Sequence, residues 1–262
     1  MPCVEERTVG EQQKNSTFKP HLEGRTVGRQ QKNQQQKRRK IVRKDNLFLL
    51  LEGCVMKYDK KNAIDIMIKA AKNYKELLQD KVFLIVYREN RVAKIVQVGF
   101  RDMHFLHLTG ICTKLSAKRF YEKCINQKLS VDDFELDKGG KAQQKLMVLP
   151  FLHELLYNNC MIGDFINSGI YIRADYFVGN TKATLSVGFR FGKNVDFPVT
   201  LYKEDVRILS QPTNKVLAIF ARNYDQEYYT KCTYLSKGQE IGKLPIDADV
   251  KALIDVDEHY EK

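Results

Sequence analysis

The chain has 262 residues, of which 43% are hydrophobic and 29% are charged, and its formal net charge is +12. This composition supports a buried core, and the sequence holds no run of eighteen apolar residues that would predict a membrane span. Its six cysteines form no Cys-x-x-Cys pair, which argues against a zinc site and a disulfide framework, so no metal or cofactor is expected.

A basic segment opens the chain. Residues 1–44 hold twelve Lys and Arg against four Glu, and residues 7–15 (RTVGEQQKN) return as residues 25–33 (RTVGRQQKN). Because this segment has few apolar side chains, we predict a disordered basic tail with a duplicated segment. Its first residues lack the basic and then apolar pattern of a secretory signal, so a cytoplasmic location is expected.

The run Lys37-Arg38-Arg39-Lys40 is the candidate substrate-binding element of this tail. Four neighbouring cations can dock phosphate groups through simple electrostatics, and a basic balance favours anionic partners, nucleic acid first. Charge alone supports equally well an inert, solvated linker.

Order is expected to begin near Asp45, with a short apolar helix or packed arm up to residue 56. From Asn62, a good N-cap residue, apolar side chains recur at three- and four-residue steps up to residue 80, which predicts an amphipathic helix. Residues 82–87 and 92–100 then form two strands of a hairpin.

Further helices are expected in the middle of the chain. Ser116 is placed to cap a helix, and Ser130 to Asp133 has the spacing of a capping box that opens a single turn. Gly139 and Gly140 break the chain before a leucine-rich helix, which Pro150 must start, kink or interrupt.

After residue 169 the apolar period changes to two, which predicts strands. Because successive strands follow without long helices between them, we expect antiparallel pairing. The fold class predicted is α+β, with N-terminal helices packed on a curved antiparallel sheet in one domain over residues 45–240, followed by a loosely attached acidic tail over residues 241–262. The expected strands are residues 170–175, 184–191, 199–202, 216–222 and 228–235.

The stretch of residues 103–111 (MHFLHLTGI) holds the candidate chemistry. His104 and His107 are three residues apart, which on a helix places them on one face. A histidine can serve as general acid or base near neutral pH, and the scarcity of nearby carboxylates, of which Asp102 is the nearest, favours that use over metal binding. The commoner alternative is a histidine that caps a turn or hydrogen-bonds a buried carbonyl.

Metal-independent nuclease chemistry needs few groups. A base removes the 2′-hydroxyl proton, an acid protonates the 5′ leaving oxygen, and cations hold the phosphate. Lys203, Arg222 and Thr230 lie on or beside predicted strands and are candidates for the last task, although solvent-facing strand residues are the commoner interpretation. The sequence contains no phosphate loop, dinucleotide fingerprint or hydrolase elbow.

Residues 74–238 resemble the fourth group of the phage barnase–EndoU–colicin–RelE-like nucleases. The motif with His-Leu-Thr-Gly is moderately specific, whereas each other piece is weak alone. The segments that carry the resemblance are FLHLTGI (105–111), SAKRFYEKC (116–124), MIGDF (161–165) with Asn167-Ser168-Gly169, LYKEDVR (201–207), and Tyr229-Thr230 to Tyr234.

The resemblance implies a helical lead before an antiparallel sheet, and metal-independent RNA cleavage in a toxin or phage-conflict role. RNA, with transfer RNA as one candidate, is then the substrate, and an antitoxin or immunity protein is a candidate partner. His107 matches the motif histidine as general acid or base and Thr109 the motif hydroxyl as a positioning donor. Lys203 and Arg222 would stabilise phosphate charge, and Thr230 would help hold the substrate.

Two other hypotheses stay open. The family does not require His104, and the catalytic set is thin, so the same scaffold could serve as a non-catalytic nucleic-acid-binding module with its basic tail. It could also bind another protein of a host. The catalytic hypothesis requires the late strands to present cations towards His107.

Overall fold

The computed structural model describes residues 58–166, 174–180 and 185–256, which all belong to one unit of the chain, Lys57–Lys262. The expectations for residues 1–56, including Lys37 to Lys40, for residues 167–169 and for most of the strand at 170–175 lie outside the described residues. Among the described helices, none has the length and apolar character needed to cross a membrane.

The amphipathic helix is α2 (Lys60–Leu77). Its N-cap is Asp59, whose carboxylate accepts the backbone N–H of Asn62 at 2.7 Å. The helix therefore begins three residues before the position expected from an N-cap at Asn62, because the acceptor at Asp59 satisfies a free N–H group of the first turn. The side chains it buries recur at helical spacing: Ala63, Met67, Ala70, Ala71 and Tyr74.

The predicted hairpin is confirmed as β1 (Lys81–Glu89) and β2 (Val92–Phe100). Glu89 pairs with Val92, so only two residues form the turn. Asn90 and Arg91 have φ values of 48° and 70°. Two left-handed residues in succession are the geometry that matches the twist of a two-residue hairpin.

The helical region follows the hairpin. Ser116 caps α4 as expected, since its side chain accepts the N–H of Arg119. Pro150 stands at the start of η2, where the α-helix gives way to a 3-10 helix. The elements in order are η1 (Asp102–His104), α3 (Phe105–Thr109), β3 (Cys112–Thr113), α4 (Ala117–Ile125), β4 (Phe134–Glu135), α5 (Lys141–Val148) and η2 (Leu149–Leu156).

The main sheet is antiparallel and follows the order β2-β1-β9-β5-β6-β7-β8, with β10 paired to β9 off this path. Strands β5 and β6 are absent from the strands predicted by alternation. They are short and contain glycines at close contacts, since a Cβ at Gly163 would lie 2.5 Å from the carbonyl oxygen of Pro212. The late elements are β5 (Met161–Phe165), β6 (Tyr176–Gly179), β7 (Ser186–Arg190), β8 (Phe197–Tyr202), α6 (Val206–Leu209), β9 (Ser210–Asn223) and β10 (Lys231–Leu235).

The two ends of this strand order meet. The N–H of Gly99 in β2 donates to the carbonyl of Asp196, and the N–H of Asp196 donates to the carbonyl of Gln97, both at 2.8 Å. Asp196 immediately precedes β8, so β2 and β8 approach each other across a parallel bridge. The sheet is thus curled back on itself.

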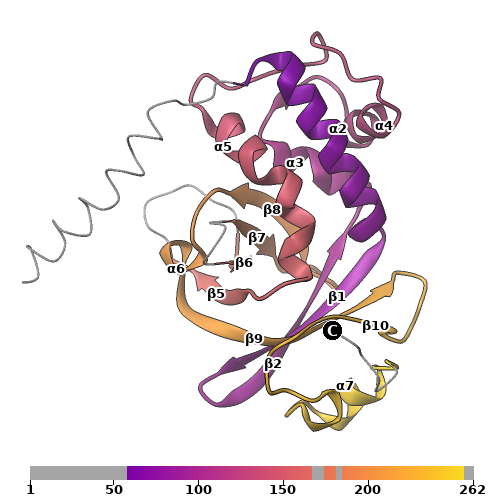
Figure 1. Ribbon diagram of the computed structural model, residues 1–262, viewed down its shortest axis with the longest axis vertical. Helices are drawn as coiled ribbons and strands as arrows, with labels where there is room; N and C mark the ends of the chain where they lie inside the picture. The colour runs from indigo at the N-terminus through magenta and orange to yellow at the C-terminus, as the bar shows by residue number, and fades with distance from the viewer. Residues whose placement is uncertain (1–57, 167–173, 181–184, 257–262) are drawn as a thin grey trace, which may run out of the picture. The chain divides into compact units, whose positions relative to one another are not determined.

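The sheet has two covered faces (Figure 1). The helical face carries Phe83, Ile85 and Phe100 and packs against α2, α3, α4, α5 and η2. The C-terminal face carries Val82 and Leu84, which alternate along β1 with Phe83 and Ile85 of the helical face. Helices over a curved antiparallel sheet confirm the predicted α+β fold.

The C-terminal segment covers the second face, in contrast to the loosely attached tail expected there. It contains η3 (Ile241–Lys243) and α7 (Ala248–Ala252). Leu244 is buried, and Tyr229 exchanges backbone hydrogen bonds with Leu253 and Asp255 at 2.8 and 3.0 Å. The segment was predicted to be loose because it is acidic, but its apolar side chains pack on the sheet.

Candidate active site

The histidine turn, defined here as residues 102–110, connects β2 to the helical region. It consists of η1 followed directly by α3, which ends at Gly110 with a left-handed φ of 71°. The carboxylate of Asp102 accepts the N–H of Met103 at 2.7 Å, which stabilises the first turn. The two histidines lie on successive short helical segments, His104 at the end of η1 and His107 in α3.

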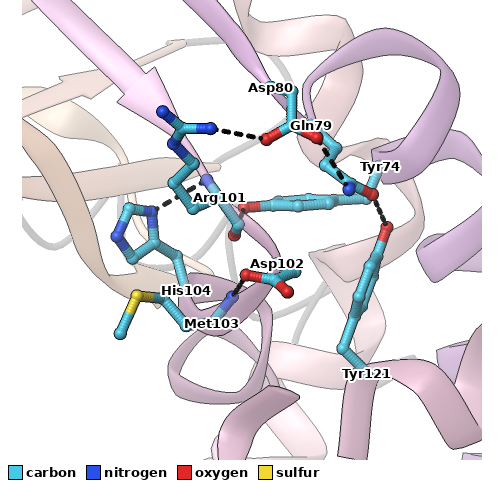
Figure 2. Close-up of polar contacts among 8 residues, drawn as sticks. All are labelled: Tyr74, Gln79, Asp80, Arg101, Asp102, Met103, His104 and Tyr121. Atoms are coloured by element: carbon cyan, nitrogen blue, oxygen red, sulfur yellow. Dashed lines mark hydrogen bonds and ion pairs between the residues drawn. The ribbon is translucent and has the colours of Figure 1, made fainter. Parts of the chain in front are cut away.

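His104 is a structural residue of this turn. Its Nδ1 accepts the backbone N–H of Arg101 at 3.1 Å (Figure 2). Its ring stacks on Phe197 of β8, with centroids 5.7 Å apart and an interplanar angle of 24°. Burial, helped by the nearby His107, lowers the pKa of His104 to about 4. The ring is therefore neutral at physiological pH, with its proton on Nε2.

A polar network fixes the chain that enters the turn (Figure 2). The Tyr74 hydroxyl donates to the carbonyl of Arg101 at 2.8 Å, and the Arg101 guanidinium pairs with Asp80 at 2.9 Å. The side chain of Gln79 donates to Asp80 at 3.0 Å and accepts from the Tyr121 hydroxyl at 2.8 Å. These contacts connect the end of α2 and the middle of α4 to Arg101, the residue that holds His104.

Among the described residues, His107 has neither the backbone hydrogen bond nor the ring stacking that holds His104. It lies in the last turn of α3 and is exposed. Its ring makes no hydrogen bond or ion pair with another residue in the described part of the chain. An exposed imidazole without an internal partner is available to a substrate proton.

Thr109 is fully buried, in contrast to His107. Its hydroxyl donates to the carbonyl of Leu106 at 2.7 Å and accepts the N–H of Ile111 at 3.3 Å. Both of its hydrogen-bonding roles are therefore used inside the fold. The hydroxyl closes the end of α3, and the structure does not present it to a substrate.

Lys145 of α5 is a site residue that the sequence did not reveal. Its Nζ donates to the carbonyl of His107 at 3.1 Å and to Oγ1 of Thr200 in β8 at 3.2 Å. Burial, and then the neighbouring charge of Lys141, lower the pKa of Lys145 to about 8, while Asp137 opposes the shift. In the sequence, Lys145 is an ordinary polar residue of an amphipathic helix, so nothing indicates that its side chain reaches the histidine turn.

Gly110 is matched to Lys145. A Cβ at this position would lie 2.6 Å from Cδ of Lys145, and the left-handed φ of 71° already favours glycine. The glycine of the His-Leu-Thr-Gly motif therefore allows the lysine side chain to cross the end of α3. In the sequence, the glycine of the motif is the one residue that indicates a side chain packed across the end of α3.

The structure separates the cations expected from the late strands. Lys203 directly follows β8, the strand that contacts α3, and is half-buried. Arg222 lies opposite Val82 of β1, so its side chain projects from the C-terminal face, away from α3. There its guanidinium lies 5.3 Å from the ring of Tyr229. Thr230 is exposed just before β10.

The histidine turn therefore gathers His107, Lys145 and the end of β8, whereas Arg222 and Thr230 belong to the β9–β10 end of the sheet. Across the described ranges, no three side chains of His, Cys, Asp or Glu converge as a metal ion would require. What the turn offers is one exposed imidazole, on a residue whose backbone carbonyl accepts a hydrogen bond from a half-buried ammonium group.

The comparisons with known proteins bear on this geometry. A family model described as phage-Barnase-EndoU-ColicinE5/D-RelE like nuclease4 matches residues 66–238, more than half of the chain. The match runs from within α2 to just beyond β10 and includes the histidine turn, α5 and the late strands. Neither the curated proteins nor the solved structures gave a match.

Proposed function

The chain belongs to this family of phage barnase–EndoU–colicin–RelE-like nucleases, and on that premise we propose that it is a metal-independent endoribonuclease. His107 acts as the general acid or base. The observation that carries the proposal is the contrast between the two histidines of the turn. His104 is bonded to the backbone and neutral, whereas His107 is exposed and free of internal hydrogen bonds to the described residues.

The reaction forms a bond between the 2′-oxygen and phosphorus and breaks the bond from phosphorus to the 5′-oxygen. One proton leaves the 2′-hydroxyl and one reaches the departing 5′-oxygen, so the products are a cyclic phosphate and a 5′-hydroxyl. A single imidazole can exchange either proton. Negative charge grows on the phosphate oxygens between the two bond changes and requires a nearby cation.

Lys145 supplies that cation. With a pKa of about 8 it is roughly nine-tenths protonated at pH 7. Two of its N–H groups are held by the carbonyl of His107 and the hydroxyl of Thr200, which orients the third. Lys203 at the end of β8 is the second candidate cation, whereas Arg222 projects from the other face.

The test is cleavage of total transfer RNA in EDTA, followed on a denaturing gel. We expect His107→Ala to abolish cleavage while the folded state is kept. His153→Ala is the matched control, because His153 lies on η2 and outside the histidine turn. Cleavage that survives His107→Ala, or that requires a divalent ion, would contradict the proposal.

A second candidate function is a non-catalytic nucleic-acid-binding module. It is favoured by the net charge of +12 and by the internal use of Thr109 and His104. Salt-dependent RNA binding without any product would support it, and removal of residues 1–44 would then collapse the affinity. Cleavage lost specifically in His107→Ala would exclude it.

The biological role that we propose is that of a toxin or conflict nuclease of phage or mobile-element type, with an antitoxin or immunity protein as partner. Growth arrest on induced expression in bacteria, absent for His107→Ala, is the expected result. Arrest by both forms would show that any toxicity is independent of the proposed chemistry.

A further inference from the structure

We propose that a groove on the edge of β9, away from the histidine turn, binds a single-stranded segment of RNA. The edge groove is defined by Tyr157, Asn158, Asn159, Lys215, Tyr234 and Lys237. The choice of RNA rests on the proposed function, whereas the groove itself rests on the geometry described below.

The groove exists because two strands share one edge of β9. Strand β5 pairs with the first part of β9, up to Lys215, and β10 pairs with the later part, from Ala218. Strand β1 occupies the opposite edge. Between the start of β5 and the end of β10, the N–H of Val216 donates to the carbonyl of Cys160 at 3.4 Å and the N–H of Ser236 donates to the carbonyl of Leu217 at 2.8 Å. Beside this junction of the two strands lies a hollow of about 640 Å³. This volume lies within the range of small-ligand sites.

The groove is positively charged and has no carboxylate in its lining. Lys215 and Lys237 are exposed, and neither forms an ion pair with another residue of the described ranges. Lys215 also lies directly opposite Arg88 of β1, a like-charge pair that is unfavourable by itself. An anion bound at this end would relieve that repulsion.

A second pair of cations lies near the other end. Lys231 of β10 is opposite Ala221, so it projects from the helical face, where its Nζ lies 5.5 Å from the ring centre of Tyr157. Burial, and then the charge of Lys231, lower the pKa of Lys81, while Glu76 opposes the shift. Thr230 immediately precedes Lys231, which places this predicted substrate-holding residue beside the groove rather than beside His107.

The remaining groups suit nucleobases. The Tyr234 hydroxyl donates to the Asn159 side-chain oxygen at 3.0 Å, and the Tyr157 hydroxyl donates to the carbonyl of Leu77 at 3.0 Å, so both rings are held in place. Asn159 is exposed, and its amide N–H groups remain available to a base edge. Fixed aromatic rings beside lysines are the combination that binds single-stranded nucleic acid, because every base has a face that can stack.

A single strand fits this hollow better than a duplex. Bases can stack on Tyr157 or Tyr234 only when they are splayed out of a helix, and double-stranded RNA is instead recognised across broad surfaces by its shape. The lining of the groove contains no histidine, cysteine or carboxylate. Its task is thus to hold the strand, and the chemistry is left to the histidine turn.

Binding is measured with a short fluorescent single-stranded oligonucleotide of 2′-O-methyl RNA, which cannot be cleaved by attack of the 2′-oxygen. The full chain is titrated against it by fluorescence anisotropy. We expect Lys215→Glu with Lys237→Glu to raise Kd by at least about tenfold and Tyr234→Ala to raise it by a smaller factor. The matched control is Lys72→Glu with Lys128→Glu, which changes the net charge equally at two exposed lysines outside the groove.

An equal rise in Kd for the groove pair and the control pair would overturn the proposal, as would an unchanged Kd for the groove pair. Crosslinking of an oligonucleotide that contains 4-thiouridine supplies a second readout. Crosslinks on the peptides with Tyr157 or Tyr234 support the groove, whereas crosslinks confined to residues 1–44 contradict it. Because the ligand is uncleavable, loss of the proposed nuclease activity would leave this result unaffected.

Discussion

Several polar side chains of the histidine turn are partly or fully buried, whereas the lysines of the edge groove are exposed. At the turn, His104 and Lys145 are partly buried and their pKa values are lowered to about 4 and about 8, and the Thr109 hydroxyl is used inside the fold. At the groove, lysines are exposed around an open hollow without any carboxylate. Burial changes proton affinities, which is what catalysis needs, whereas exposed charge and aromatic rings provide binding. We therefore expect the cleavage rate and the affinity for RNA to depend on different residues.

The largest effect after loss of His107 is expected at Lys145. Replacing it by Met should lower the cleavage rate about tenfold to a hundredfold and leave the Kd for the uncleavable strand unchanged, because one phosphate-stabilising cation is lost. In the native protein the rate should also fall as pH rises through about 8, where Lys145 loses its proton, and the variant should lack this decline. Single-turnover rates from pH 6 to about 9.5 test both points.

Lys138→Met is the control for this variant, because Lys138 is exposed beside the start of α5. A Lys145→Met protein with an unchanged cleavage rate but weakened RNA binding would contradict this division of roles. The turn would then hold substrate rather than promote its reaction.

Gly110→Ala should lower the free energy of unfolding by about 2–3 kcal/mol, because the new Cβ meets a left-handed φ and the Lys145 side chain together. Gly140→Ala is the matched control. Gly140 has a similar φ of 75° but nothing within 4 Å of the added Cβ, so about 1 kcal/mol is expected. Urea denaturation measures both, and equal losses would show that the contact with Lys145 has no energetic weight.

His104 should make stability depend on acidity. Its folded pKa of about 4 lies below the ordinary value of 6.5, so between these values the unfolded chain binds a proton that the folded chain does not. The unfolding free energy should thus fall by about 1–2 kcal/mol from pH 6.5 to pH 4 on this account. His104→Asn, which keeps an acceptor for the Arg101 N–H, should remove that part of the slope.

His107→Asn is the control for the acid slope, since His107 is exposed and without an internal partner among the described residues. A slope that disappears in His107→Asn and persists in His104→Asn would reverse the assignment of the two histidines.

The smallest effect is expected at Arg222. Because its side chain projects from the C-terminal face and packs by Tyr229, Arg222→Met should change the cleavage rate by less than about threefold. A loss as large as that of Lys145→Met would mean that the substrate reaches both faces of the sheet. Rates at saturating RNA, compared with melting temperature, separate this outcome from simple destabilisation.

Much of the fold could be predicted because its signals are local. The hairpin over β1 and β2 and the Ser116 cap depend on neighbouring residues alone. The face on which Arg222 projects depends on the pairing of β9 with β1, and a shift of one residue would reverse it. The contact of Lys145 with the turn likewise depends on how α5 packs, which no local pattern encodes.

The C-terminal segment illustrates the other limit of local signals. Its acidic residues suggested a loose tail, yet Leu244, Val250 and Leu253 pack on the second face of the sheet. Such a segment has charged side chains on one side and apolar side chains on the other. Whether the apolar side chains are buried depends on whether the fold offers an apolar surface for them to pack against.

The junction of β2 with Asp196 and β8 sets the order in which the histidine turn can be completed during folding. Val98 and Asp196 pair although they are far apart in sequence, and such distant contacts form late because the intervening loop must close first. His104 stacks on Phe197, and Lys145 is held by Thr200, both of β8. A nascent chain still lacking β8 cannot complete the histidine turn.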